Sequence, residues 1–141
     1  MTRRESRESA FQVLFALSLN GIDCEDAIEL ANLIEEPMLD EFALRLVRTT
    51  IKYISEIDAI LIPNLNDWSI NRLSKVTLAI LRLSCAQLFY WTEIDDEVEG
   101  KLHRIVIDEA VRITKAFGTD DEYIYVNGVL GTIVRTHLDT R

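Results

Sequence analysis

Residues Trp68–Trp91 read WSINRLSKVTLAILRLSCAQLFYW, and between Val76 and Tyr90 only Arg82 carries a charge. Apolar residues fall on every side of a helix drawn through this stretch, which is typical of a helix buried in a bundle or in a membrane. The apolar run is shorter than the ~20 residues that span a bilayer. We therefore predict a central core helix that other helices surround. Because an unpaired buried charge is costly, we also predict that Arg82 is paired internally or covered by a partner.

The composition favours one domain over residues 1–141. The chain has 141 residues, 48% of them hydrophobic, which supports a substantial core and excludes global disorder. Its 5 glycines and 2 prolines are few, as in helical proteins with short connections. The net charge of −9 argues against a general polyanion binder, since nucleic-acid-binding domains usually have a basic surface. Cys24 and Cys85 lack metal-ligand spacing, so we predict reduced, buried thiols.

We interpret the N-terminus as a helix and not as a signal peptide. Three arginines precede an apolar run over Ala10–Leu19, but Glu5 and Glu8 interrupt the basic region and no small-residue cleavage site follows. Thr2 and Glu5 have the spacing of a capping box, in which each side chain bonds to the other's backbone N–H. We therefore expect a cytoplasmic protein without a membrane segment.

Helical periodicity covers the rest of the chain, and no strand-like alternation of useful length occurs. We predict an all-α fold of six or seven helices, with either Ser69 or Ser74 capping the central one. In the last helix, we expect Val126, Val129, Leu130 and Ile133 to face inward. The other predicted helices are one that ends at Gly21, a shorter one after Asp23, a long one over Met38–Leu61 between Pro37 and Pro63, a short turn over Ile70–Leu73, one over His103–Phe117 and a last one that a capping box at Thr119–Glu122 opens.

No motif in the sequence indicates catalysis or a bound metal. The segment from Asp95 resembles the start of a calcium-binding loop, but the twelfth position is Val106, where a bidentate glutamate is required. His103 and His137 have no partner at ligand spacing, and no phosphate-binding loop or nucleophile elbow occurs. We expect no enzyme activity, no cofactor and no metal, and we interpret Glu93–Gly100 as a solvated acidic loop.

Two local patterns break the rules of helix composition. Arg3, Arg4 and Arg7 place three cations at a helix N-terminus, where they oppose the macrodipole unless an anion is present. This mismatch favours anion binding, and the alternative is a solvated helix start. Asn127 and Gly128 are poor helix formers within the last helix. We predict that Gly128 allows close approach of a neighbouring helix and that Asn127 bonds to its backbone.

Several blocks of the sequence have a specific order and spacing. They are Arg3-Arg4…Arg7-Glu8…Ala10…Gln12…Leu14-Phe15, Trp68…Arg72-Leu73…Val76, Ala79-Ile80-Leu81-Arg82-Leu83, Asp108-Glu109-Ala110-Val111…Lys115…Phe117-Gly118 and Val126-Asn127-Gly128-Val129-Leu130. Together they resemble the NusB family of bacterial transcription antitermination factors, over essentially the whole chain.

The resemblance implies an all-helical fold of two helical subdomains and a function without catalysis. Proteins of this family bind boxA RNA together with NusE, a small-subunit ribosomal protein, and help RNA polymerase to read through terminators, notably on ribosomal RNA operons. The family's pattern implies two sets of contact residues here. The RNA-binding set is Arg3, Arg4, Arg7, Asp121 and Tyr125, and the NusE-binding set is Arg82 and Gln87.

The chain departs from the family's pattern at three places, and two other functions remain as alternatives. The family usually has Glu at the position of Gln87, Asn at that of Asp108, and a shorter, proline-containing link in place of Glu93–Leu102. One alternative is a homodimeric interaction module that does not bind RNA. The other is a relationship to the helical domains fused to RNA cytosine methyltransferases, although no residues remain here for a cofactor-binding domain.

Overall fold

The computed structural model describes residues 2–19, 39–66, 69–97 and 100–138, with the side chain of Leu19 excepted. Within these ranges the chain forms six α-helices and no strand, as predicted. The helices are α1 (Arg3–Leu19), α3 (Glu41–Lys52), α4 (Ile54–Leu61), α5 (Lys75–Phe89), α6 (Leu102–Phe117) and α7 (Glu122–Ile133). Short 3₁₀ turns lie at Ile62–Asn64 (η1), Ile70–Arg72 (η2) and Trp91–Glu93 (η3), and a π-helical turn follows α7 at Val134–Leu138.

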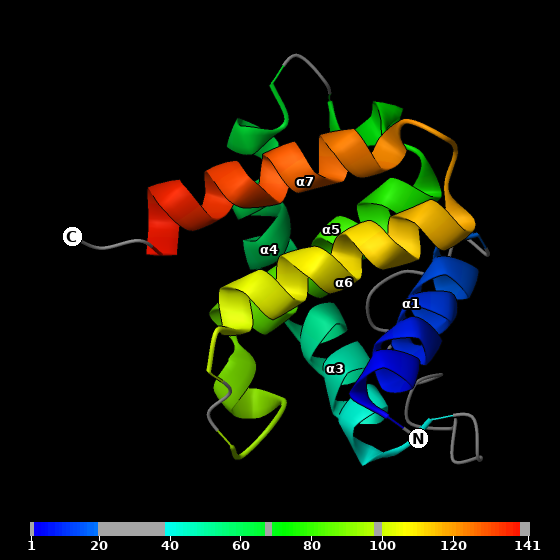
Figure 1. The fold of residues 1–141 in the computed structure, drawn as a ribbon, viewed down its shortest axis with the longest axis vertical. Helices are drawn as coiled ribbons and strands as arrows, with labels where there is room; N and C mark the ends of the chain where they lie inside the picture. The colour runs from blue at the N-terminus through cyan, green and yellow to red at the C-terminus, as the bar shows by residue number, and fades with distance from the viewer. Residues whose placement is uncertain (1, 20–38, 67–68, 98–99, 139–141) are drawn as a thin grey trace.

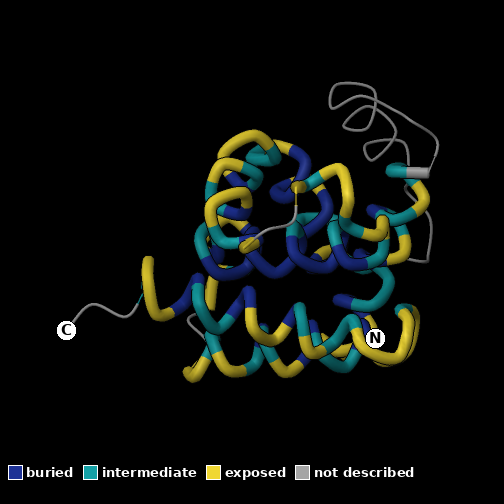
Figure 2. Tube along the Cα trace, turned by 90° about the horizontal axis from the view of Figure 1, so that it is seen from above, coloured by how far each residue is buried: buried dark blue, intermediate teal, exposed yellow. Residues whose placement is uncertain are grey.

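Helix α5 is the central helix that the apolar stretch predicts. Ser74 caps it by accepting a hydrogen bond from the Thr77 backbone N–H at 3.0 Å. The helices α1, α3, α4, α6 and α7 all pack against it. Figure 1 shows α6 and α7 along one side of α5, with α1 and α3 crossing on another. In Figure 2 the buried turns face the interior and the exposed turns lie on the outside. The apolar sides of α5 thus all pack against neighbouring helices.

The thiol of Cys85 lies inside this core. The residue has no exposed surface. Burial, with the negative charge of Asp58 as a smaller cause, raises the pKa of Cys85 to about 12. The thiol therefore stays protonated and unreactive at neutral pH. The prediction of a buried, reduced cysteine is confirmed for Cys85, whereas Cys24 lies outside the described residues.

The capping box predicted at the start of α1 is present. The Glu5 N–H donates to Thr2 Oγ1 at 3.1 Å, and the Thr2 N–H donates to Glu5 Oε1 at 2.8 Å. Farther along the helix, Phe11 is buried and its ring centroid lies 5.2 Å from that of Phe117 on α6. The predicted end at Gly21, the helix after Asp23 and the role of Pro37 all lie outside the described residues.

The single helix predicted over Met38–Leu61 is wrong, because the chain forms two helices that meet at Tyr53. Asp40 caps α3 by accepting from the Ala43 N–H at 2.8 Å, and α3 ends at Lys52. Tyr53 has φ −106° and ψ 22°, which is outside the helical region. Its ring stacks on that of Tyr90, with centroids 3.9 Å apart, and its hydroxyl donates to Glu93. The apolar spacing continues across this bend, so the sequence pattern alone does not reveal it.

The α6–α7 pair confirms one prediction and contradicts another. The four residues expected to face inward from α7 are all buried: Val126, Val129, Leu130 and Ile133. Gly128, however, is exposed, and no neighbouring atom lies within 4 Å of the position where a Cβ would be. Asn127 is exposed as well. The expected close helix approach at Gly128 is therefore wrong, because this side of α7 faces outward.

Glu122 joins the starts of α5 and α7. Its carboxylate accepts hydrogen bonds from Ser74 Oγ at 2.5 Å, Thr77 Oγ1 at 3.1 Å and the Thr119 N–H at 2.9 Å. Half of the predicted capping box is thus formed, by Glu122 reaching back to Thr119. Partial burial disfavours the charged carboxylate, but these hydrogen bonds outweigh it, so the pKa of Glu122 is lowered.

We expect Glu122→Gln to lower the free energy of unfolding at pH 7 by about 1 kcal/mol, because it weakens charge-assisted hydrogen bonds that solvent partly screens. A lowered folded-state pKa contributes stability above the unfolded-state pKa, and this contribution disappears as the pH falls through the folded-state value. Urea unfolding should therefore show a larger loss at pH 7 than at pH 3. Glu97→Gln, an equal charge change at an exposed residue, is the control. Equal losses at both pH values would contradict the expectation.

Candidate nucleic-acid interface

Arg3 is held on the surface by an aromatic ring and a carboxylate. Its guanidinium carbon lies 4.1 Å from the centroid of the Phe42 ring on α3. Its Nη2 donates to Asp95 Oδ2 at 2.8 Å, and the side chain is still 47% exposed. Stacking and ion pairing fix the plane of the guanidinium. Arg3 therefore presents an oriented cation to solvent.

Arg4 lies beside Arg3 on the same turn of α1 and is more exposed. Its side chain is 66% exposed, with Nε 3.3 Å from Glu109 Oε2 on α6. Its backbone carbonyl accepts from Arg112 Nη2 at 3.3 Å. The two arginines thus form one basic edge where the start of α1 meets α6 and the segment after α5.

Arg112 is a partly buried cation that binds carboxylates on two helices. Its guanidinium bonds to Glu109 on α6 at 3.1 Å and to Glu8 on α1 at 3.0 Å. Burial lowers the pKa of Arg112, but the hydrogen bonds with these two carboxylates outweigh it and raise the pKa. Arg112 therefore stays charged and joins α6 to α1, below the exposed arginines.

Arg7 and Gln87 form a buried pair, which the sequence did not predict for either of them. Arg7 is only 3% exposed and Gln87 only 2%. Arg7 Nε donates to Gln87 Oε1 at 2.6 Å, and Gln87 Nε2 donates to the Leu83 carbonyl at 3.2 Å. The family's pattern implied an RNA contact for Arg7 and a NusE contact for Gln87, and these binding roles stay predictions. Both side chains lie between α1 and α5, because the first turns of α1 pack onto the C-terminal half of α5.

Asp121 and Tyr125 lie around a separate pocket. The Tyr125 hydroxyl donates to the Leu65 carbonyl at 3.0 Å, and partial burial raises the pKa of Tyr125. Together with Arg72 and Leu73, the two residues line an opening of about 260 Å³. Figure 1 shows α6 between α7 and the first turns of α1. The structure therefore brings Arg3 and Arg4 together and Asp121 and Tyr125 together, but it does not unite the two sets.

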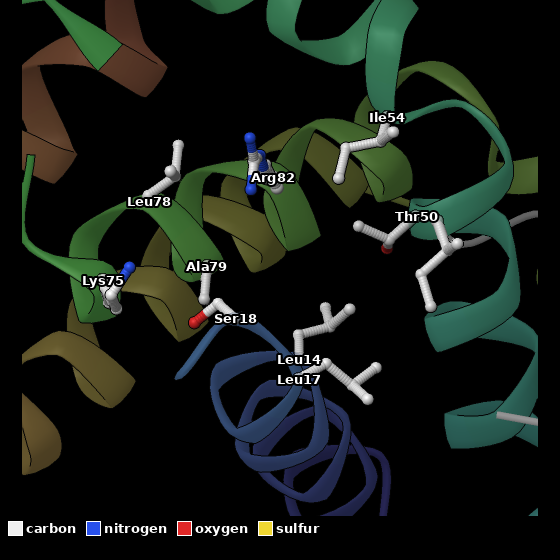
Figure 3. Close-up of a pocket in the computed structure, with 10 residues that line it drawn as sticks. Leu14, Leu17, Ser18, Thr50, Ile54, Lys75, Leu78, Ala79 and Arg82 are labelled. Atoms are coloured by element: carbon white, nitrogen blue, oxygen red, sulfur yellow. The ribbon is translucent and has the colours of Figure 1, made fainter. Parts of the chain in front are cut away.

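Arg82 is paired inside the chain, as one of its two predicted alternatives required. Its Nε and Nη2 donate to the two carboxylate oxygens of Asp58 on α4, at 2.9 and 2.7 Å. The side chain is 22% exposed and lines a pocket of about 270 Å³. Figure 3 shows this pocket between the later turns of α1, the junction of α3 with α4, and α5, with Leu14, Leu78 and Ile54 among its walls. Arg82 therefore remains partly accessible although its charge is compensated.

Across the part of the chain that the structure describes, no group of three or more His, Cys, Asp and Glu residues could hold a metal ion. None of the described helices is long and apolar enough to cross a membrane.

The fold and the order of the sequence blocks match one protein family. A model of the NusB family matches residues 4–135. The chain belongs to the NusB family. It is 38% identical to transcription antitermination protein NusB of Exiguobacterium sp. over 96% of this chain and 98% of the relative. It is 37% identical to the protein of the same name from Listeria monocytogenes, over 94% of this chain and 96% of the relative.

Solved NusB structures have the same fold. T. maritima NusB superposes with a TM-score of 0.78 at 29% identity, covering 97% of this chain and 93% of that chain. A second structure contains the antitermination factors NusB and NusE in complex with double-stranded RNA. It matches with a TM-score of 0.73 at 29% identity, over 96% of this chain and 97% of that chain. The expected all-helical NusB architecture is confirmed.

Two neighbours of the basic edge in this NusB-family chain could not be found from the sequence. Phe42 and Asp95 contact Arg3 from positions far away along the chain. Asp95 belongs to the segment that we interpreted as a solvated loop, and the only sequence signal for it is that segment's acidity. The anion that the three arginines required is thus partly internal, because Asp95 and Glu109 already face Arg3 and Arg4.

Proposed function

We propose that this chain is a non-catalytic transcription antitermination factor that binds boxA RNA together with NusE in the bacterial cytoplasm, as part of an RNA polymerase antitermination complex. The observation that carries the proposal is the exposed pair Arg3 and Arg4 at one edge of a NusB fold, 47% and 66% exposed. Guanidinium groups bind phosphate oxygens in a planar, two-pronged geometry. Membership of the family and the solved complex of NusB, NusE and RNA support the assignment.

The RNA contacts proposed for the chain change in one respect from those that the sequence implied. Arg3 and Arg4 contact phosphates directly, whereas Arg7 acts through Gln87 by holding α1 on α5. Asp121 and Tyr125 remain proposed contacts for an unpaired base, since aromatic side chains stack on bases that leave a helix. An RNA strand that contacts both Arg3–Arg4 and Asp121–Tyr125 must cross α6.

We propose that NusE binds on the side of Arg82. The pocket beside Arg82 is partly open and mostly apolar in its lining, with leucines and isoleucines around a compensated ion pair. The net charge of −9 attracts a basic ribosomal protein. Because Gln87 is buried, it does not contact NusE directly. Since every described helix packs on α5, we also propose that residues 1–141 act as one domain.

Replacing Arg3 and Arg4 together with glutamine is expected to weaken RNA binding and its dependence on salt. Each phosphate contact with single-stranded RNA contributes about −0.7 to the slope of log affinity against log salt, so losing two contacts makes the slope less steep by about 1.4. Fluorescence anisotropy with a boxA-like RNA, with and without the ribosomal protein, measures both quantities. Stability should change little, because both side chains are exposed.

Arg135→Gln is the matched control for this pair. It removes one positive charge from an exposed arginine in the turn after α7, at the end of that helix away from α1 in Figure 1. It should leave affinity and slope nearly unchanged. Wild-type binding by the Arg3/Arg4 variant would contradict the proposed function. In that case a homodimeric interaction module is the remaining alternative, and light scattering on the eluting protein would show a dimer.

A further inference from the structure

The acidic segment that follows α5 is built against the start of α1. Ile94 is 1% exposed, which anchors the segment to the core. The Trp91 indole N–H donates to the Glu97 carbonyl at 2.9 Å, and the Asp95 N–H donates to the Trp91 carbonyl at 3.0 Å. These contacts hold the Asp95 side chain in place, and it is only 17% exposed. Asp95 is therefore a positioned carboxylate, unlike a residue of a freely solvated loop.

The Asp95 carboxylate engages one hydrogen-bond donor of the Arg3 guanidinium. Arg3 Nη2 donates to Asp95 Oδ2 at 2.8 Å while the face of the guanidinium lies on Phe42. A carboxylate and a phosphate offer a guanidinium the same arrangement of two acceptor oxygens. An RNA phosphate that binds Arg3 in this two-pronged geometry through Nη2 therefore competes with Asp95 for that donor. Arg4 is more exposed and meets Glu109 at a longer 3.3 Å.

We propose that Asp95 is an internal competitor for the RNA backbone: its carboxylate engages Arg3 in the free protein, and an RNA phosphate displaces it. This inference rests on the proposed function. Arg4 makes the first phosphate contact, and Arg3 exchanges Asp95 for the next phosphate. The exchange reduces the affinity of the isolated protein for RNA. It also reduces the salt dependence of RNA binding, because salt weakens the competing Arg3–Asp95 pair as well.

The neighbouring acidic residue supplies a matched control. Asp96 belongs to the same segment and carries the same charge, but its carboxylate is 89% exposed and lies 3.7 Å from Arg45, not beside Arg3. Asp95→Asn and Asp96→Asn change the net charge equally. Only Asp95→Asn releases Arg3, and asparagine still offers an oxygen to the Glu97 N–H, which Asp95 Oδ1 accepts at 3.3 Å in the wild type.

The test is anisotropy titration of a boxA-like RNA, with the ribosomal protein present, at several salt concentrations. Asp95→Asn should bind ~2–5-fold more tightly than Asp96→Asn, since an exposed ion pair is worth that much. Its salt slope should be steeper by up to about 0.7, the contribution of one phosphate. In an Arg3→Gln background the two variants should bind alike, because Arg3 is then no longer present to be released.

The possible outcomes distinguish failure of the Asp95 proposal from failure of the proposed RNA-binding function. Equal affinities of the Asp95 and Asp96 variants would overturn the competitor, because any gain over wild type would then come from net charge alone. A difference that persists in the Arg3→Gln background would also overturn it. Absence of RNA binding in every protein, wild type included, would overturn the proposed function and the competitor with it. Asp95→Ser, which also keeps an acceptor oxygen, repeats the test if the asparagine variant melts at a lower temperature.

Discussion

Replacing Leu81 with alanine is expected to lower the free energy of unfolding by ~2–5 kcal/mol, the range for a truncated core leucine. Leu81 has no exposed surface, and it lies near the middle of the helix that every other described helix contacts. Few neighbours can move into the space because they are themselves held by α5. The cost therefore combines lost burial with a cavity that does not close.

Urea unfolding followed by circular dichroism measures this loss. Leu78→Ala is the matched control, because Leu78 is on the same helix but is only half-buried, on the wall of the pocket in Figure 3. Its loss should be clearly smaller. A loss below about 1 kcal/mol for Leu81→Ala would mean that α5 is peripheral, contrary to the fold described above.

Replacing Arg7 with glutamate is expected to lower the free energy of unfolding by ~3–5 kcal/mol, as for other buried charges that lose their partner. The substitution directs a carboxylate at Gln87 Oε1, an acceptor that now receives the Arg7 N–H at 2.6 Å. Both side chains are almost fully buried, so water cannot relieve the repulsion. The effect should appear as a lower unfolding midpoint in urea.

Arg4→Glu gives the matched comparison, since it reverses the same charge three residues away on a side chain that is 66% exposed. It should lower the free energy of unfolding by less than about 1 kcal/mol. If Arg7→Glu cost no more than Arg4→Glu, the buried pair would not exist in solution. A variant that reverses Arg3, Arg4 and Arg7 together is therefore a poor test of RNA binding, because its loss of stability would obscure its loss of binding.

The Arg7–Gln87 pair also explains how the basic edge is positioned. Arg3 and Arg7 are four residues apart, so both lie on the side of α1 that faces α3, and both guanidinium groups approach the Phe42 ring. Arg7, the buried one, joins α1 to α5, and Arg3 remains accessible to solvent. The geometry of the exposed arginines thus depends on a buried contact beneath them.

Local sequence was sufficient for the elements whose determinants lie within a few residues. The all-round apolarity of Val76–Tyr90 predicts a buried central helix, and α5 is that helix. The Thr2–Glu5 spacing predicts a capping box that forms as expected. The order of short blocks was enough to indicate the NusB family, which the family match confirms.

Tertiary contacts decided where helices bend and which charges are accessible. The bend at Tyr53 accompanies its stacking on Tyr90, which is remote in sequence. Arg3 and Arg7 are equivalent in local sequence, yet one is 47% exposed and the other 3%. The difference arises from Gln87, 80 residues away from Arg7, and from Asp95, 92 residues away from Arg3. Helix formation depends on the spacing of nearby residues. The burial of a charge depends on which distant residues pack over it, and only the tertiary structure determines those residues.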